Sequence, residues 1–268
     1  MNNDSTERVS YLSLSAHEIR PIEKPVVRET AWTIYLNGQE LVTILCTPNK
    51  MSFLVLGFLA SEGIIQNLDD VGVLRVCEDE GNVVDVRLRD ESLSLPGKRV
   101  LLSGCGGGVS FEDLEASHAM LTSSLAVAPG QISKLMRDLR KGAEVYRTAG
   151  GIHASALSDG ERLLIVAEDV ARHNTLDKIR GECIYHHIPT KDQIILTTGR
   201  ISSEMVKKAV RMEVPVVVSR TSPTDLAIRL AESWGMTVIG YVRGKKMNVY
   251  TWPERVKRDQ ETEAPNPR

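Results

Sequence analysis

A dense group of polar side chains follows a short apolar run in the second half of the chain. The apolar run, residues 163–167, is typical of a buried strand. Seven strongly polar or charged residues then follow within eleven positions: Glu168, Asp169, Arg172, His173, Asn174, Asp177 and Lys178. Ligands of open α/β proteins bind in the crevice beyond the strand ends. The group is therefore either a ligand site or a solvated strand-to-helix turn in which Asp169 or Asn174 caps the helix.

Cys105 stands in a glycine-rich run, residues 103–108, with the sequence Ser-Gly-Cys-Gly-Gly-Gly. Such a backbone has little steric restriction. Turns rich in free backbone N–H groups favour the thiolate, which is the reactive form of cysteine. A thiolate can attack a donor persulfide and keep the sulfane sulfur as its own persulfide. From the residues alone, Cys105 is either such a carrier or an unreactive cysteine in a loop.

Two expected strand-to-helix junctions, residues 199–203 and 222–224, carry groups that suit an anion. The free N–H groups of a helix N-terminus attract phosphate, and glycine permits its close approach. The residues that would form this diphosphate pocket are Gly199, Arg200, Ser202, Ser222 and Thr224. The alternative is that Ser202 and Ser222 are simple N-caps.

A basic segment, residues 240–246, ends an expected strand near the C-terminus. Its arginine and lysines suit contact with an anion, and Tyr241 suits stacking on a base. The residues concerned are Tyr241, Val242, Arg243, Gly244, Lys245 and Lys246. A solvated basic turn is the alternative interpretation.

The composition of the 268-residue chain excludes several classes of protein. Charged residues make up 25% of the chain and the net charge is −2, which argues against disorder and against a protein that coats polyanions. Aromatic residues are only 4%, which disfavours a platform for base stacking. No apolar run is long enough to span a bilayer, and the polar N-terminus predicts no signal peptide. The four scattered cysteines fit a reduced, cytoplasmic protein.

The pattern of apolar residues predicts strands and helices that alternate along most of the chain. Asn37-Gly38 joins two strands by a type I′ turn, and Thr47-Pro48 begins a helix that ends near Glu62. The expected strands are 31–36, 40–46, a hairpin over 71–89, 152–157, 162–167, 193–197, 214–219, 237–242 and 247–251. The other expected helices are 111–121, 130–146, 173–185, 202–212 and 223–234.

These elements suggest five segments, with an α/β fold class for the chain as a whole. They are a flexible leader over 1–22, a small α+β domain over 23–93, a linker with the cysteine loop over 94–128, an α/β domain over 129–252, and a disordered tail over 253–268.

Five stretches of the chain, in order, resemble the FdhD/NarQ family of formate dehydrogenase accessory sulfurtransferases. They are residues 61–65 (SEGII), 148–153 (TAGGIH), 167–178 (AEDVARHNTLDK), 198–205 (TGRISSEM), and 222–227 together with 240–250. The resemblance extends from about residue 25 to about residue 252. It implies a cytidine-deaminase-like, three-layer α/β/α fold with a mixed sheet for the C-terminal domain.

The resemblance also implies a function. Cys105 would accept sulfur from a cysteine desulfurase as a persulfide and deliver it to the bis-molybdopterin guanine dinucleotide form of the molybdenum cofactor, before that cofactor enters formate dehydrogenase. The segment from Tyr241 to Lys246 would bind the guanine dinucleotide, for which GDP would be a mimic. The anion-binding residues named above, with Arg172 and His173, would complete the cofactor site. A cytoplasmic homodimer is expected on the same ground.

The chain departs from the family pattern at two positions. Gly108 stands where many members have the second cysteine of a Cys-x-x-Cys pair, and Ala171 stands where glycine is usual. A single cysteine must then suffice for a carrier, and a non-catalytic chaperone that binds the molybdenum cofactor remains an alternative. A zinc-dependent deaminase would share the fold, but His153 lacks the His-x-Glu spacing and no Cys-x-x-Cys is present.

Overall fold

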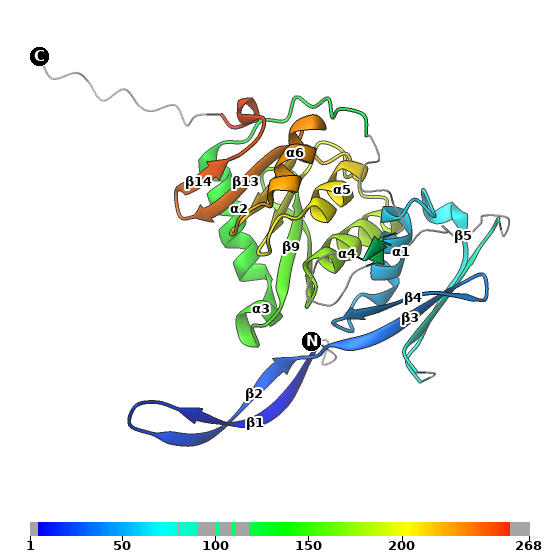
Figure 1. The fold of residues 1–268 in the computed structure, drawn as a ribbon, viewed down its shortest axis with the longest axis vertical. Coiled ribbons are helices and arrows are strands. Elements are labelled where there is room, and N and C mark those ends of the chain that lie inside the picture. Colours follow the sequence, from blue (N-terminus) through cyan, green and yellow to red (C-terminus); the bar gives the residue numbers. More distant parts are fainter. Residues whose placement is uncertain (1–4, 80, 91–99, 102–108, 111–117, 258–268) are drawn as a thin grey trace, which may run out of the picture. The chain divides into compact units, whose positions relative to one another are not determined.

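The computed structural model describes residues 5–79, 81–90, 100–101, 109–110 and 118–257 (Figure 1). Cys105 and Gly108 lie outside these residues. The chain forms two compact units, and each unit is built from separate segments. Unit 1 comprises residues 1–116, 140–155 and 166–189, and unit 2 comprises 117–139, 156–165 and 190–268. These units differ from the contiguous domains expected from the sequence, because helix α4 (Arg172–Tyr185) packs on an N-terminal helix, α1 (Met51–Ser61).

The N-terminal residues form a hairpin rather than the flexible leader expected over 1–22. Strand β1 (Thr6–Leu14) pairs antiparallel with β2 (Ile19–Val27). The Arg28 N–H donates to the Ser5 carbonyl (2.9 Å) at the base of the hairpin. Because apolar and β-branched residues are interspersed along both strands, the segment has the composition of a strand pair despite its polar start.

A four-stranded sheet, in the order β4-β3-β6-β5, forms the core of unit 1. Its strands are β3 (Thr30–Leu36), β4 (Gln39–Cys46), β5 (Val71–Cys77) and β6 (Val83–Leu88). Asn37 and Gly38 have φ values of 51° and 80°, as the predicted type I′ turn requires. Apolar side chains of α1 and of this sheet form one buried cluster, which includes Trp32, Leu54 and Val84.

Helix α1 begins later than the sequence predicted. Lys50, the residue before it, has φ 53°, which is the left-handed region and cannot continue into a right-handed helix. Thr47 and Pro48 therefore lie outside the helix. At the other end the helix stops near Glu62, as predicted, and Gly63 has φ 73°, the left-handed conformation that commonly ends a helix. A short 3-10 helix, η2 (Leu68–Asp70), then leads into β5.

Helices α1 and α4 approach until their backbones touch. A Cβ on Gly57 would lie 1.8 Å from the Asp177 carbonyl oxygen, and one on Gly181 would lie 1.9 Å from that of Phe53. No side chain fits at either glycine. This crossing fixes the start of α4, and with it the polar group of residues 168–178, against the N-terminal half of the chain.

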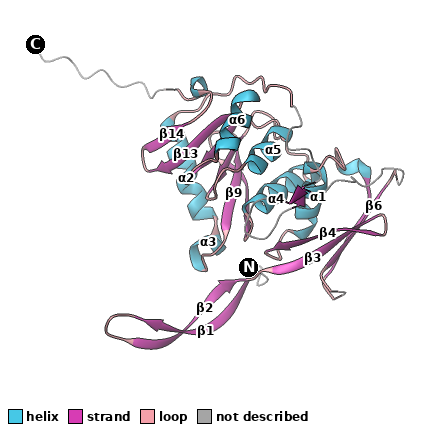
Figure 2. Cartoon of the chain, in the orientation of Figure 1, coloured by secondary structure: helices cyan, strands magenta, loops and turns pink. Residues whose placement is uncertain are grey.

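A six-stranded mixed sheet, in the order β10-β9-β11-β12-β13-β14, runs through the rest of the fold (Figure 2). Its strands are β9 (His153–Ser158), β10 (Leu163–Asp169), β11 (Ile194–Thr197), β12 (Val216–Ser219), β13 (Thr237–Arg243) and β14 (Lys246–Val249). Strands β11, β12 and β13 are parallel, and β14 is antiparallel to β13. Every residue of β11 and β12 is buried, as is typical of parallel strands. The expected α/β class is confirmed.

The remaining helices are α2 (Pro129–Gly142), α3 (Glu144–Thr148), α5 (Ser203–Arg211) and α6 (Asp225–Ser233). The single helix predicted over 130–146 is broken at Ala143, whose backbone is extended. Of the helix predicted over 111–121, residues 118–121 are not helical and the rest lie outside the described residues. Among the described helices, none is long and apolar enough to cross a membrane.

Residues 253–257 are structured, although the sequence analysis placed them in a disordered tail over 253–268. Residues Pro253–Arg255 form a 3-10 helix, η3. The Lys257 N–H then donates to the Val127 carbonyl (3.1 Å), and Val256 pairs with Val127 in an isolated bridge. Residues 258–268 lie outside the described part. Two short strands, β7 (Val100–Leu101) and β8 (Val109–Ser110), pair on either side of residues 102–108.

Candidate functional site

The polar group of residues 168–178 is a buried network in unit 1. The Lys178 ammonium lies 2.7 Å from Asp169 Oδ2, and neither side chain has exposed surface. Lys178 Nζ also donates to the Asn49 side chain (2.9 Å) and to the carbonyls of Thr47 (3.0 Å) and Glu168 (3.1 Å). The ammonium is thus surrounded by oxygen atoms, which compensates for its removal from water.

Asp169 is saturated by the same network. Its Oδ1 accepts from the Ala171 N–H (2.9 Å) and the Asn174 amide (2.9 Å), and its Oδ2 accepts from the Thr47 N–H (3.2 Å). Asn174 also donates to the Leu45 carbonyl (3.0 Å). The N-cap of α4 is Ala171, without a capping side chain. Asp169, Asn174 and Lys178 are therefore neither in a solvated turn nor open to a ligand, because their side chains join β10 and α4 to the segment before α1.

Two further carboxylates of the group, those of Glu168 and Asp177, accept hydrogen bonds from neighbouring helices. Glu168 accepts from the N–H groups of Val145 (3.2 Å) and Tyr146 (2.6 Å) in the first turn of α3, where a negative charge is favourable. Asp177 accepts from the Ser61 hydroxyl (2.8 Å) at the end of α1. Two of the sequence motifs, residues 61–65 and 167–178, thus meet in space.

Arg172 and His173, predicted to bind the cofactor, are almost completely buried, with 6% and 7% of their surfaces exposed. Burial lowers the pKa of nearby His153, and the positive charge of Arg172 lowers it further. Arg172, His173 and His153 thus lie in the interior of unit 1. The expected role of Arg172 and His173 in cofactor binding stays a prediction.

The other predicted cofactor residues come together in unit 2, at the carboxyl ends of β11, β12 and β13. The Ile201 N–H donates to the Ser222 carbonyl (3.1 Å), and the Thr224 N–H donates to the Ile201 carbonyl (2.9 Å). The Tyr241 N–H donates to the Thr221 carbonyl (3.0 Å). Three loops far apart in sequence therefore form one continuous surface, at the edge where open α/β sheets bind ligands.

This surface is basic. The side chains of Arg200, Tyr241, Arg243, Lys245 and Lys246 are exposed. Val242 is buried in β13 and Gly244 lies in the turn to β14, where its carbonyl accepts from Ser133 Oγ (2.7 Å). Val242 and Gly244 can offer a ligand only backbone atoms, whereas the four cations and the tyrosine ring are accessible to an anionic, aromatic ligand.

Tyr241 has an unusual backbone. Its φ is 53°, and the pairing of β13 with β14 shifts register between Gly240 and Arg243. A bulge of this kind redirects a side chain, and a left-handed conformation is strained for tyrosine. The preceding residue must be glycine, because a Cβ on Gly240 would lie 2.9 Å from the Thr221 carbonyl oxygen. No pattern in the sequence indicates this strain.

The two helix N-termini at this surface differ. Thr224 caps α6, since its hydroxyl accepts from the Ala227 N–H (3.3 Å), so the cap lies at Thr224 and not at Ser222 as the alternative interpretation expected. Ser202 precedes α5 but makes no capping bond, and its Oγ is buried without a hydrogen-bond partner among the described residues. A buried hydroxyl without a partner is costly, so the start of α5 fits a ligand that accepts or donates a hydrogen bond there.

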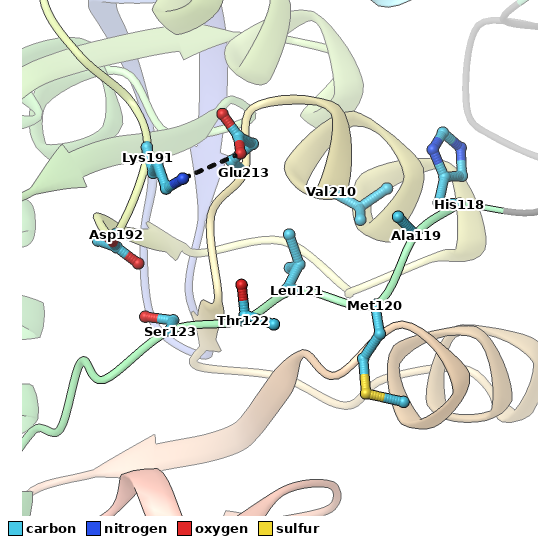
Figure 3. A pocket seen from close by; sticks show the side chains of 10 residues that line it. All are labelled: His118, Ala119, Met120, Leu121, Thr122, Ser123, Lys191, Asp192, Val210 and Glu213. Carbon is cyan, nitrogen blue, oxygen red and sulfur yellow. Dashed lines mark ion pairs between the residues drawn. The ribbon is translucent and has the colours of Figure 1, made fainter.

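Two cavities lie away from these residues. One, of about 220 Å³ in unit 2, is lined by residues that include Leu121 and Val210, with the Lys191–Glu213 ion pair (3.5 Å) at its side (Figure 3). It is smaller than the cavities that usually hold cofactors. The other, of about 370 Å³ in unit 1, is lined by Lys50, Glu168 and their neighbours. No sequence motif had indicated the first cavity, whereas Thr148 and Glu168 at the second belong to the motifs 148–153 and 167–178. Within the described residues, no three His, Cys, Asp or Glu side chains group as metal ligands.

Comparison with known proteins identifies the family. The model of the FdhD/NarQ family matches residues 27–257. The chain belongs to the FdhD/NarQ family. The recognition from sequence motifs is thereby confirmed, and the match covers both compact units, including the basic surface and the buried Asp169–Lys178 pair.

Named relatives of this FdhD/NarQ protein are sulfur carriers. The sulfur carrier protein FdhD of Bacillus subtilis is 39% identical over 245 residues, which cover 90% of this chain and 93% of the relative. That of Staphylococcus haemolyticus is 33% identical over 262 residues, or 96% and 99% of the two chains. A crystal structure of a formate dehydrogenase accessory protein from Desulfotalea psychrophila matches with a TM-score of 0.78 at 25% identity, over 94% of this chain and 100% of the other.

Of the three cysteines that the structure describes in this FdhD/NarQ protein, two are poor nucleophiles. Cys46 and Cys183 are buried. Burial, assisted by the charge of Asp169, raises the pKa of the Cys46 thiol to about 12. Burial, assisted by Glu182, likewise raises the pKa of Cys183 to about 12. Cys77 is half-buried on β5. At neutral pH, Cys46 and Cys183 therefore carry almost no thiolate.

Proposed function

We propose that this FdhD/NarQ protein is a sulfur carrier that uses Cys105. It takes sulfur from a cysteine desulfurase as a Cys105 persulfide and transfers it to the bis-molybdopterin guanine dinucleotide cofactor needed for formate dehydrogenase activity. The relatives named as sulfur carriers support the role. Cys105 is chosen because the Cys46 and Cys183 thiols are buried and have raised pKa values. Cys105 and Cys77 are then the cysteines that can react.

Of these two, Cys105 suits the role better. Cys77 lies within strand β5, where its backbone is fixed by pairing with Val83. Cys105 is flanked by four glycines between positions 104 and 108, so the residues next to it in the sequence add no side-chain bulk. A carrier must meet two large partners in turn, and a thiol without bulky neighbours meets that requirement.

The loading step is a thiolate exchange. The Cys105 thiolate attacks the outer sulfur of the desulfurase persulfide, the sulfur–sulfur bond of the donor breaks, and the donor cysteine leaves as a thiolate. The new persulfide on Cys105 holds the transferred sulfur. Sulfur moves between two cysteines of the same oxidation level, so the loading step consumes no oxidant or reductant.

The basic surface of unit 2 is the proposed site for the cofactor, as the substrate that receives sulfur. Tyr241 would stack on the guanine base, and Arg200, Arg243, Lys245 and Lys246 would contact the phosphates. The start of α5, with Gly199 and Ser202, would take a phosphate, and Ser222 and Thr224 would border the same pocket. The partnerless Ser202 hydroxyl supports this assignment. Arg172 and His173 remain part of the proposed site, although their burial leaves little surface for contact.

The proposal includes protein partners. A cysteine desulfurase would donate the sulfur, formate dehydrogenase would receive the finished cofactor, and the carrier would act in the cytoplasm as a homodimer. A chaperone that binds the cofactor without thiol chemistry is the competing function, and Gly108 in place of a second cysteine favours it.

An assay of formate dehydrogenase maturation in cells distinguishes the sulfur carrier from the chaperone. In cells that lack their own copy of this protein, the Cys105→Ala variant is expected to restore no formate dehydrogenase activity, whereas Cys77→Ala is expected to restore it fully. A chaperone would predict restored activity from both variants. Immunoblots for both variants, with GDP binding by the purified proteins, would show that each is present and folded.

A further inference from the structure

The larger of the two cavities described above lies within unit 1, and the proposed function does not use it. Its volume is about 370 Å³, which is within the range of small-molecule sites. Its lining comes from four segments: the start of β1, the two residues before α1, the end of α2 with α3, and β10. All of these residues belong to unit 1. Segments far apart in the sequence thus enclose one space, which we call the unit 1 cavity.

Lys50 contributes a hydrogen-bond donor whose position is fixed. Its Nζ donates to the Val166 carbonyl (2.9 Å) and to Glu182 Oε2 (2.5 Å). An ammonium group has three N–H donors, and in the described part of the chain Lys50 has no further partner. Lys50 can therefore donate one hydrogen bond to a ligand without moving, as a preorganised site requires.

Glu168 contributes acceptors that are also held in place. Its Oε1 accepts from the Tyr146 N–H (2.6 Å), and its Oε2 accepts from the Val145 N–H (3.2 Å). A carboxylate has about four acceptor positions, and these two bonds are the ones that the side chain of Glu168 makes within the described residues. Glu168 can therefore accept further hydrogen bonds from a donor-rich group of a ligand.

The lining of the unit 1 cavity carries an excess of negative charge. Glu144 and Glu168 both line it, and neither forms an ion pair with another described residue. The positive charge of Lys50, in contrast, is neutralised by Glu182. Such a site repels phosphates and attracts an ammonium group. The unit 1 cavity therefore suits a ligand of different chemistry from the one that suits the basic surface of unit 2.

The donor and the acceptors are spaced for one small ligand. Val166 and Glu168 are alternate residues of β10, so they lie on one face of the strand, about 7 Å apart. Lys50 is bonded to the first of them, and the free acceptors belong to the second. A molecule with a carboxylate and an ammonium on one carbon can span this distance with a hydrogen bond at each end. Little room is left beside it, because a Cβ on Gly142 would lie 3.6 Å from Val166 Cγ2.

We propose that the unit 1 cavity binds a free α-amino acid with a small side chain. The ammonium group of the ligand lies against Glu144 and Glu168, and its carboxylate accepts the third hydrogen bond of Lys50. Its side chain packs on Val145 and Val166. Cysteine and alanine, which a cysteine desulfurase consumes and releases, belong to this class. The inference does not rest on the sulfur-carrier proposal, because it concerns neither the proposed cofactor site nor the sulfur-carrying thiol.

Three small ligands test the chemical class. Saturation-transfer NMR titrations of the full-length protein compare L-alanine with ethylamine, which lacks the carboxylate, and with propionate, which lacks the ammonium group. L-alanine is expected to bind with about millimolar affinity, ethylamine more weakly, and propionate not measurably. No binding of L-alanine would overturn the proposal. Binding of ethylamine or propionate as tightly as L-alanine would also overturn it, because both charged groups of the ligand would then not be recognised.

Two variants place the ligand in the unit 1 cavity. Glu144→Gln removes an exposed carboxylate from the lining and is expected to weaken L-alanine binding about tenfold, the effect of losing one hydrogen bond to a charged group. Gly142→Met fills the space with a flexible side chain and is expected to abolish binding. The matched control is Glu161→Gln, which neutralises an exposed carboxylate of unit 2 and should leave binding unchanged.

Melting temperatures of the three variants show that each is folded. Unchanged L-alanine binding in either Glu144→Gln or Gly142→Met, with the variant folded, would contradict the site. An equal loss of binding in Glu161→Gln and Glu144→Gln would contradict it too, because the effect would then come from net charge. Each of these results would leave sulfur loading of the protein unaffected, so the two proposals are tested separately.

Discussion

Lys178 Nζ lies 2.7 Å from Asp169 Oδ2, and both side chains are fully buried. The pair joins β10 and α4 to the segment that precedes α1, through Thr47 and Asn49. The motif that looked most like a ligand site in the sequence thus holds unit 1 together. Asp169 and Lys178 therefore act on any function of this protein through the fold, and variants at these two positions should first be measured for stability.

Removing the Lys178 charge should destabilise the protein strongly. In Lys178→Met the Asp169 carboxylate keeps its three other donors but loses its buried counter-ion, a change that costs about 3–5 kcal/mol. Urea unfolding measures the loss. The exposed pair of Arg229 and Asp225 (2.9 Å) provides the control, since Arg229→Ala should leave the unfolding midpoint nearly unchanged. A similar urea unfolding midpoint for Lys178→Met and Arg229→Ala would show that the buried ion pair stabilises the protein no more than the exposed one does.

Alanine at Gly57 should separate α1 from α4. The added Cβ would lie 1.8 Å from a backbone oxygen, so the helices must move apart, at a cost of about 3 kcal/mol. Gly142→Ala is the matched control, because its Cβ would meet only Val166 Cγ2 at 3.6 Å. That substitution should be neutral or stabilise by up to about 1 kcal/mol. The melting temperature of Gly57→Ala should therefore fall while that of Gly142→Ala stays the same or rises, and equal destabilisation would refute the close crossing.

His153 should make stability depend on pH in a defined direction. Burial and the Arg172 charge lower its pKa below 6.5, so the unfolded chain binds a proton more readily than the folded one. Stability from this residue is therefore complete above pH 6.5, decreases as pH falls below that value, and stops decreasing below the folded pKa. In His153→Gln, the free energy of unfolding should vary less between neutral and mildly acidic pH than in the parent. A larger variation in the variant would contradict the lowered pKa.

Tyr241→Gly should stabilise the protein while weakening nucleotide binding. Glycine adopts φ 53° without strain, and the exposed ring contributes little packing, so a gain of about 1 kcal/mol is expected. Loss of the ring removes the proposed stacking on guanine, so calorimetry should show weaker GDP binding. Tyr241→Phe keeps the ring and should bind GDP nearly as the parent does. If Tyr241→Gly binds GDP with unchanged affinity, Tyr241 is not part of the nucleotide site.

The elements of this fold could largely be predicted from local patterns. The Asn37-Gly38 turn, the hairpin through Gly81 and Asn82, and the parallel strands β11 to β13 follow from turn residues and apolar runs, and all are present. The sequence also placed Gly199, Arg200, Ser202, Ser222 and Tyr241 at strand ends. Because parallel strands end at one edge, their assembly into one surface follows from the topology.

The failures arise where distant segments decide the structure. The burial of Asp169 and Lys178 depends on Thr47 and Asn49, more than a hundred residues earlier, and no local pattern reports it. The same long-range packing makes the compact units discontinuous. The left-handed backbone of Lys50, which delays α1, and that of Tyr241 also depend on tertiary context, since neither residue type favours it.

Direct detection of sulfur on Cys105 tests the central claim. The purified protein is incubated with a cysteine desulfurase and cysteine, and its intact mass is measured for the parent, Cys105→Ala and Cys77→Ala. A sulfur carrier predicts a gain of one sulfur atom, removed by a reductant, in the parent and in Cys77→Ala but not in Cys105→Ala. No gain in the parent, with GDP binding retained, or an equal gain in Cys105→Ala, would contradict carriage of sulfur by Cys105.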